Sequence, residues 1–235
     1  MEIFTNISGV LLPALFFSLL SLARFTINIG FVERPIVAGL LWGAVIGDFT
    51  IAISLAVFYE LFWLDLFPTG TYIPPNPLFP MFTVFCIAGT QPQPDASTLF
   101  LPVLFTLFLG PFGAWLEKIH REWQISSYDR LLRHFRGSHK LNSAAKQAIT
   151  SSIAQLFLFN LAAFLLVASL CLIIINIARA SFSYSFVFPG IPWALVWAFG
   201  LAGGILSLRI RQSYAVFFTG SVGFAVVILF GYGLH

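Results

Sequence analysis

Six uncharged stretches constrain this chain more than any other feature of its sequence. A helix needs ~20 consecutive apolar residues to cross the hydrocarbon of a bilayer, and each stretch is long enough. They cover residues 3–23, 66–94, 96–116, 147–178, 180–208 and 212–235. Hydrophobic residues make up 59% of the chain and charged residues only 9%, which excludes an ordinary soluble domain. The sequence therefore predicts an all-α integral membrane protein, a helical bundle that crosses the bilayer several times.

We expect one membrane domain over residues 1–235. Residues 31–95 form the predicted transport region, and residues 152–235 form spans that serve as scaffold or oligomer contacts. Residues 117–151 form a basic amphipathic connection that contains seven of the twelve Lys and Arg residues. Basic connections beside spans mark the cytoplasmic side, so this one lies on the lipid bilayer or docks a cytosolic partner. The net charge of +3 therefore does not indicate nucleic acid.

Ionisable residues interrupt the apolar sequence most often within residues 31–80. They are Glu33, Arg34, Asp48, Glu60 and Asp65. A charge at bilayer depth is costly unless it faces a cavity or a partner, so these positions indicate a solute pathway. Glu60 either lines that pathway or forms a structural salt bridge with Arg24 or Arg34.

Residues 35–47 are too few to cross a membrane as a helix, since thirteen residues span only ~20 Å. Pro35 breaks the preceding helix because the residue before a proline is pushed out of the helical region. We therefore expect a re-entrant or half-spanning helix. Gly39, Gly43 and Gly47 recur every four residues, which predicts one smooth face for close helix packing or for sliding.

Residues 67–80 contain five prolines and are predicted to be irregular. Irregular backbone at membrane depth is tolerated where it is buried in protein or lines an aqueous cavity, as in transporter binding sites. Thr69, Thr71 and Asn76 would suit an uncharged, polyhydroxylated solute. The alternative is an exposed outer loop.

Enzyme signatures are missing from the sequence: it has no nucleotide-binding loop and no nucleophile or metalloprotease motif. Cys86 and Cys171 lie in apolar stretches and are explained by packing. The histidines of the polar connection are not paired with metal-spaced acids. The sequence thus predicts no cofactor, no metal and no catalytic residue, and transport must be driven by an ion gradient or by partner proteins.

The order of motifs in residues 31–80 resembles the enzyme IIC subunit of the mannose/fructose/sorbose family of the sugar phosphotransferase system. The matching residues are Glu33-Arg34-Pro35, Gly39, Gly43, Gly47-Asp48, Glu60-Leu61 and Gly70-Thr71-Tyr72-Ile73-Pro74-Pro75-Asn76. The family pattern has an Arg-Pro step, a Gly-Asp step, a Glu-Leu pair and a Pro-Pro-Asp segment in this order. Asn76 stands where Asp is usual, and Asp65 stands where Gly is usual.

The resemblance implies a permease subunit of the bacterial cytoplasmic membrane that translocates a hexose-type sugar. Its partners would be a IID-like membrane subunit, a IIB protein whose phosphohistidine phosphorylates the sugar, and IIA. An elevator-like movement and trimers of the IIC–IID pair are also implied.

The resemblance and the residues together assign roles to single positions. Substrate-binding residues would be Glu60, Asn76, Asp65, Gly70, Thr71 and Asp48. Structural or hinge residues would be Arg34, Pro35, Gly39, Gly43, Gly47, Pro74 and Pro75. Two other functions stay open at this point: a gradient-driven transporter with Asp48 and Glu60 as ion relays, and a membrane scaffold that transports nothing.

Overall fold

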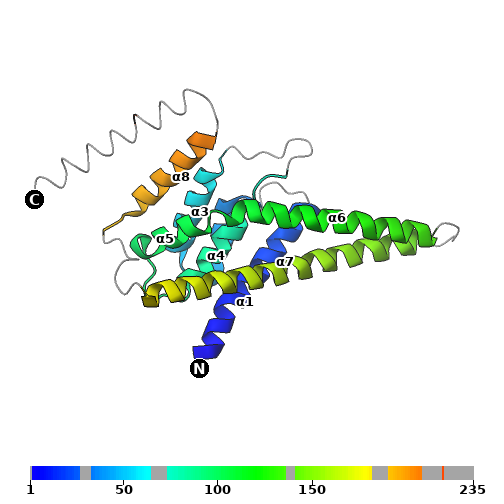
Figure 1. Cartoon of the computed structure of the whole chain (residues 1–235), viewed down its shortest axis with the longest axis horizontal. Helices are drawn as coiled ribbons and strands as arrows, with labels where there is room; N and C mark the ends of the chain where they lie inside the picture. The colour runs from blue at the N-terminus through cyan, green and yellow to red at the C-terminus, as the bar shows by residue number, and fades with distance from the viewer. Residues whose placement is uncertain are drawn as a thin grey trace, which may run out of the picture.

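The computed structural model of the chain describes residues 2–26, 33–64, 73–135, 141–181, 190–207 and 219. Within these ranges it gives no account of the side chains of residues 2–8, 23–26, 126–135 and 141–148. Every described element is an α-helix, which confirms the predicted fold class (Figure 1). The helices are α1 Glu2–Thr26, α2 Pro35–Ile46, α3 Phe49–Phe62, α4 Leu78–Ala88, α5 Ala96–Thr106, α6 Leu109–Phe135, α7 Leu141–Ser181 and α8 Trp193–Ser207.

The first helix and the break after it follow the sequence. α1 covers the predicted first span and contains Pro13. Arg34 has an extended backbone, with φ −76° and ψ 131°, and Pro35 is the first residue of α2. The first helical position suits proline, because the N–H that proline lacks would have no partner there.

Residues 96–116, predicted as one span, form two helices that meet at an angle of 40°. Pro111 explains the break: it has no N–H for the carbonyl of Leu107, and its ring clashes with that carbonyl. The Leu107 carbonyl instead accepts the N–H of Gly110 at 3.2 Å, which closes a tighter turn. The segment predicted as one full span is therefore bent in its middle.

The basic connection also differs from the expected surface helix. Residues 117–135 continue α6 without a break, and residues 141–151 begin α7. α6 and α7 run side by side in Figure 1, and the Gln124 amide donates to the Ser152 hydroxyl at 2.7 Å between them. His120 is only 3% exposed, so the start of the connection belongs to the packed bundle.

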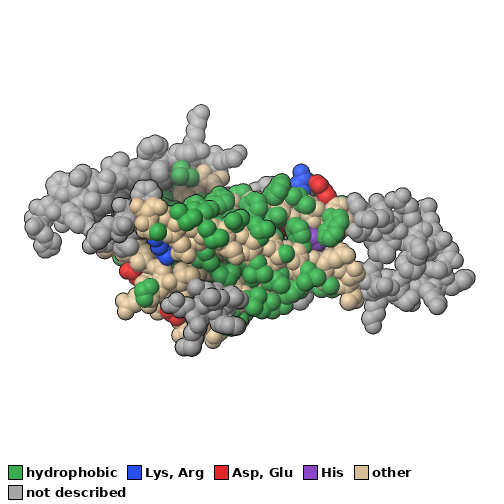
Figure 2. Space-filling view, turned by 60° about the horizontal axis from the view of Figure 1, so that its bottom comes forward, with side chains coloured by type: hydrophobic (Ala, Val, Ile, Leu, Met, Phe, Trp, Pro, Cys, Tyr) green, Lys and Arg blue, Asp and Glu red, His purple; other side chains and the backbone are tan. Residues whose placement is uncertain are grey.

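Membrane-length helices are fewer among the described residues than the uncharged stretches suggest. Residues Ile149–Ser181 of α7 are long and apolar enough to cross a membrane, and the bent pair of α5 and α6 makes a second candidate. The remaining apolar segments with described side chains have 10–17 residues, and for α1 this segment is Gly9–Leu22. The expected last span, residues 212–235, lies outside the described residues. Figure 2 shows hydrophobic side chains across the middle of one face, with charged side chains toward its ends.

Aromatic residues join the short helices to the long ones. Phe17 of α1 lies between Phe79 of α4 and Phe164 of α7, with ring centroids 5.1 and 4.8 Å away. Trp42 of α2 contacts Phe82 of α4 edge-on, at 5.6 Å. Aromatic pairs in this geometry add to the free energy of burial, so these contacts fix α2 on the bundle.

α8 packs against α3 through small residues. A β carbon on Gly204 would overlap the Leu61 carbonyl, and one on Gly200 would lie 2.8 Å from the Phe58 carbonyl. The indole N–H of Trp197 donates to the Ser54 carbonyl at 3.0 Å. The second half of the chain therefore contacts the predicted transport region directly.

Candidate functional site

α2 and α3 form an antiparallel hairpin whose two helices touch at glycines. A β carbon on Gly39 would overlap that of Ala56, and one on Gly43 would lie 3.2 Å from that of Ala52. The predicted close packing is confirmed for these two glycines. α2 has 12 residues, ~18 Å of helix, and turns back instead of crossing a membrane. This is the half-spanning helix that the sequence predicted.

Gly47 and Asp48 make the turn of this hairpin. Gly47 has φ +82°, a left-handed conformation that favours glycine, and its N–H donates to the Gly43 carbonyl at 2.8 Å. It therefore ends α2 and does not share the packing face of Gly39 and Gly43. Asp48 Oδ1 accepts the N–H groups of Thr50 at 3.0 Å and Ile51 at 3.2 Å, so Asp48 is the N-cap of α3.

The cap predicts how Asp48 variants behave. Replacing Asp48 by Ala removes the acceptor and lowers the free energy of unfolding by about 1 kcal/mol, whereas Asn keeps an acceptor and has little effect. Thermal unfolding of the purified protein measures the difference, and sugar uptake by Asp48→Asn should equal that of the unaltered chain. Lost uptake at an unchanged melting temperature would show instead that the carboxylate acts on the solute.

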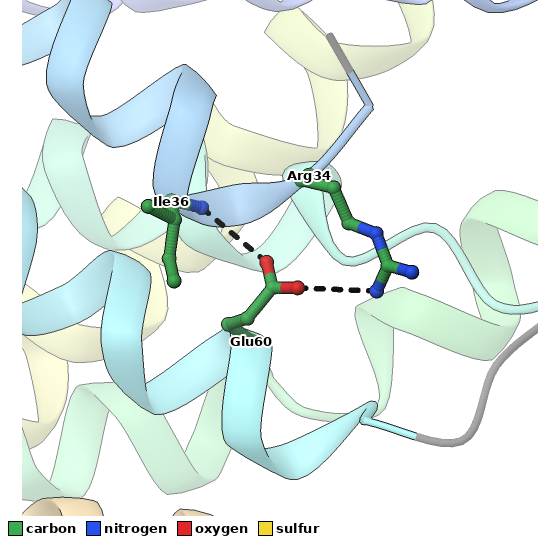
Figure 3. Close-up of polar contacts among 3 residues, drawn as sticks. All are labelled: Arg34, Ile36 and Glu60. Atoms are coloured by element: carbon green, nitrogen blue, oxygen red, sulfur yellow. Dashed lines mark hydrogen bonds and ion pairs between the residues drawn. The ribbon is translucent and has the colours of Figure 1, made fainter. Parts of the chain in front are cut away.

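The open end of the hairpin holds an acid and a base together (Figure 3). Arg34 Nη1 donates to Glu60 Oε1 at 3.1 Å, and the N–H of Ile36 donates to Glu60 Oε2 at 3.4 Å. Glu60 thus lies at the N-terminus of α2, where the helix dipole favours an anion. Its side chain is 15% exposed and that of Arg34 is 37% exposed. Of the two expected salt-bridge partners, Arg34 is the one in place; the side chain of Arg24 lies outside the described residues.

Asn76 ends the irregular segment and is 9% exposed. Its backbone N–H donates to the Gly110 carbonyl at 3.0 Å, and its Oδ1 accepts the N–H of Leu78 at 3.1 Å. Residues 73–76, including Pro74 and Pro75, are non-helical as predicted. Residues 78–80 are helical, contrary to the prediction. The Asn76 side chain accepts the N–H of Leu78, the first residue of α4, and Pro80 lies in the first turn, where N–H groups need no helical partner.

Glu60 and Asn76 are linked through two residues that the sequence did not single out. Trp63, one turn after Glu60, packs its ring directly on Gly110, and the Gly110 carbonyl accepts the N–H of Asn76. The Gly110-Pro111 pair inside an apolar stretch is a signal that could have indicated this break. Asp48 lies twelve residues from Glu60, ~18 Å away at the other end of α3. Asp65, Gly70 and Thr71 lie outside the described residues.

Comparison with known proteins identifies the protein family in which this hairpin occurs. Residues 7–113 match the family model described as the PTS system sorbose-specific IIC component. This match identifies the first half of the chain as that of an enzyme IIC subunit of the mannose/fructose/sorbose family. The matched residues include the whole hairpin, the irregular segment and the break at Pro111.

The fold of the chain is also similar to that of a solved membrane protein. A solved chain described as "Structure of membrane protein" superposes with a TM-score of 0.60, at 16% sequence identity, over 96% of this chain and 92% of its own length. A search of curated proteins found no match. The IIC subunit is thus a membrane component of a sugar phosphotransferase system: a sugar permease subunit that acts with other proteins of that system.

Proposed function

We propose that the IIC subunit binds a hexose-type sugar at Glu60 and Asn76, with Asp65, Gly70 and Thr71 as further contacts. The position of Glu60 carries the proposal. A carboxylate has about four acceptor positions, and Arg34 and Ile36 use two of those of Glu60. The remaining positions suit the hydroxyl groups of a sugar. Asp48 acts on the hairpin turn instead of on the sugar.

The other predicted positions move or shape the site. The small faces of Gly39 and Gly43 let α2 lie close to α3, so the hairpin can travel as one body. Arg34 and Pro35 set where the hairpin begins, and Gly47 where it turns. Pro74 and Pro75 restrict the segment that carries Asn76.

The family match supports the choice of partners. We propose that a IIB protein phosphorylates the sugar and that IIA supplies IIB, and the sequence of this chain has no nucleotide-binding motif of its own. A IID-like subunit completes the complex, as trimers of the IIC–IID pair, and the chain crosses the bacterial inner membrane several times.

Binding of labelled hexoses to the purified complex tests the site. The Asn76→Ala variant loses the amide and should bind its sugar about tenfold or more weakly, since a lost hydrogen bond leaves a polar group unpaired at ~1–3 kcal/mol. The Asn76→Asp variant is the matched control, because it keeps an acceptor for the Leu78 N–H and carries the acid usual in the family. Unchanged affinity in Asn76→Ala would exclude Asn76 from the site.

A further inference from the structure

A small polar cavity lies inside the bundle, and neither Arg34 nor Glu60 lines it. Its polar lining comes from α1, α6, α7 and the segment before α4, and consists of Ser21, Asn76, Glu117, His120 and Asn160. The cavity has room for a single water-sized group, which is much less than a sugar ring requires.

Three side-chain atoms around this cavity have no hydrogen-bond partner among the described residues. They are Ser21 Oγ, His120 Nε2 and Asn160 Nδ2, each fully buried and each from a different helix. Ser21 is 4% exposed and His120 is 3% exposed. Buried polar groups in folded proteins are almost always hydrogen-bonded, so three around one cavity point to a shared partner.

Ser18 shows that a buried serine of α1 can pair with the helix backbone, which Ser21 does not do. It lies about one turn earlier on α1 and is also buried, but its hydroxyl donates to the Ala14 carbonyl at 2.7 Å. The buried hydroxyls of Thr83 and Thr106 likewise donate to carbonyls of the preceding turn. Ser21 does not use this partner and lies on the cavity instead.

The donors and acceptors that line the cavity indicate which small molecule or ion fits it. Asn160 Nδ2 is a donor, whereas Ser21 Oγ and His120 Nε2 can each donate or accept. Water both donates and accepts, and a buried water typically makes about three hydrogen bonds. A metal ion fits less well: Glu117 and His120 are the only acid and base of the lining, Glu117 already pairs with Arg121, and no metal-binding group occurs among the described residues.

We propose that this cavity binds one water molecule, which bridges Ser21, His120 and Asn160 and so joins α1, α6 and α7. Asn76 lines the same cavity, so the water lies beside the segment that carries it. The spacing of Glu117 and His120, three residues apart, turns both toward this point on α6. The sequence alone placed His120 in a solvated connection.

Radiolytic hydroxyl-radical labelling of the purified IIC subunit tests this site. X-ray irradiation activates bound water in place, so buried side chains beside it are oxidised although bulk solvent does not reach them. We expect labelling of His120 and of Leu156, which also lines the cavity, but not of Leu99, which is fully buried away from it. The Asn160→Leu or Ser21→Ala variant should reduce labelling of His120 to the level of Leu99, whereas Ser18→Ala should leave it unchanged.

Each alternative occupant gives its own result. Absence of labelling at His120 and Leu156 in the unaltered chain would overturn the proposal. A change in labelling on adding a chelator would show that the occupant is a metal ion and not water. Loss of labelling on adding a hexose would show that it is a sugar hydroxyl. Labelling that survives both additions supports bound water, and this readout does not depend on whether Glu60 and Asn76 bind the sugar.

Discussion

Sugar uptake is lost when Glu60 is replaced by Gln, while the protein still assembles in the membrane. Gln has nearly the same size and keeps an acceptor for the Ile36 N–H, but it loses the charge and one acceptor oxygen. Hydrogen bonds to charged groups contribute about 1.5–3 kcal/mol each. Loss of one or two of them in the sugar site reduces uptake by about tenfold to more than a hundredfold. Uptake of labelled sugar by cells, normalised to the amount of protein in the membrane, measures the change.

The Arg34→Gln variant is the control for the ion pair. It removes the Arg34–Glu60 contact from the other side and keeps the carboxylate. If Glu60 only holds Arg34, adding Glu60→Gln to Arg34→Gln causes no further loss of uptake. We expect a further loss in the double variant, because Glu60 also contacts the sugar. Equal uptake in Arg34→Gln and the double variant would make Glu60 a purely structural residue.

Replacing Gly204 by Ala destabilises the protein most strongly among the single methyl additions. The added β carbon would overlap the Leu61 carbonyl, a backbone atom of α3 that cannot rotate away as a side chain can. Overpacking of this kind costs about 1–3 kcal/mol. The melting temperature should fall by roughly 2–12 °C, given ~2–4 °C per kcal/mol for a chain of this length. Fluorescence-monitored thermal unfolding in detergent measures it.

Gly9 supplies the matched control for Gly204. It is also helical, but nothing lies within 4 Å of where its β carbon would be. Alanine is the better helix former by ~1 kcal/mol, so Gly9→Ala should leave the melting temperature unchanged or raise it. Equal melting temperatures for the two variants would contradict the close packing of α8 on α3.

Local backbone chemistry made the hairpin predictable. The start of α2 follows from Arg34-Pro35, because this effect acts within a few residues. Gly39 and Gly43 predicted a face for close packing, but that α3 is the helix packed on it needed the structure. The break between α5 and α6 was missed because hydropathy counts apolar residues and ignores where a proline removes a hydrogen bond. Gly110 and Pro111 were the sequence signal for this break. The contact of Gly110 with Asn76 could not be predicted from them, because these residues are distant in sequence.

The candidate site was only partly predictable for the same reason. An acid in an apolar helix is conspicuous, so Glu60 was found, but the choice between Arg24 and Arg34 as its partner needed the three-dimensional arrangement. Asp48 was equally conspicuous, and its role as a helix cap became visible only with its two N–H partners. His120 was placed in the polar connection because its sequence neighbours are charged, but the structure buries it.

Reconstituted vesicles test the central claim most directly, that this chain moves the sugar while partner proteins supply the phosphate. The IIC subunit and a IID-like subunit are placed in vesicles with labelled hexose on one side and phosphorylated IIB on the other. The account predicts that sugar phosphate appears on the IIB side only when IIB is phosphorylated, and that Glu60→Gln prevents it. Accumulation of unmodified sugar driven by a proton gradient, without phosphorylated IIB, would contradict it.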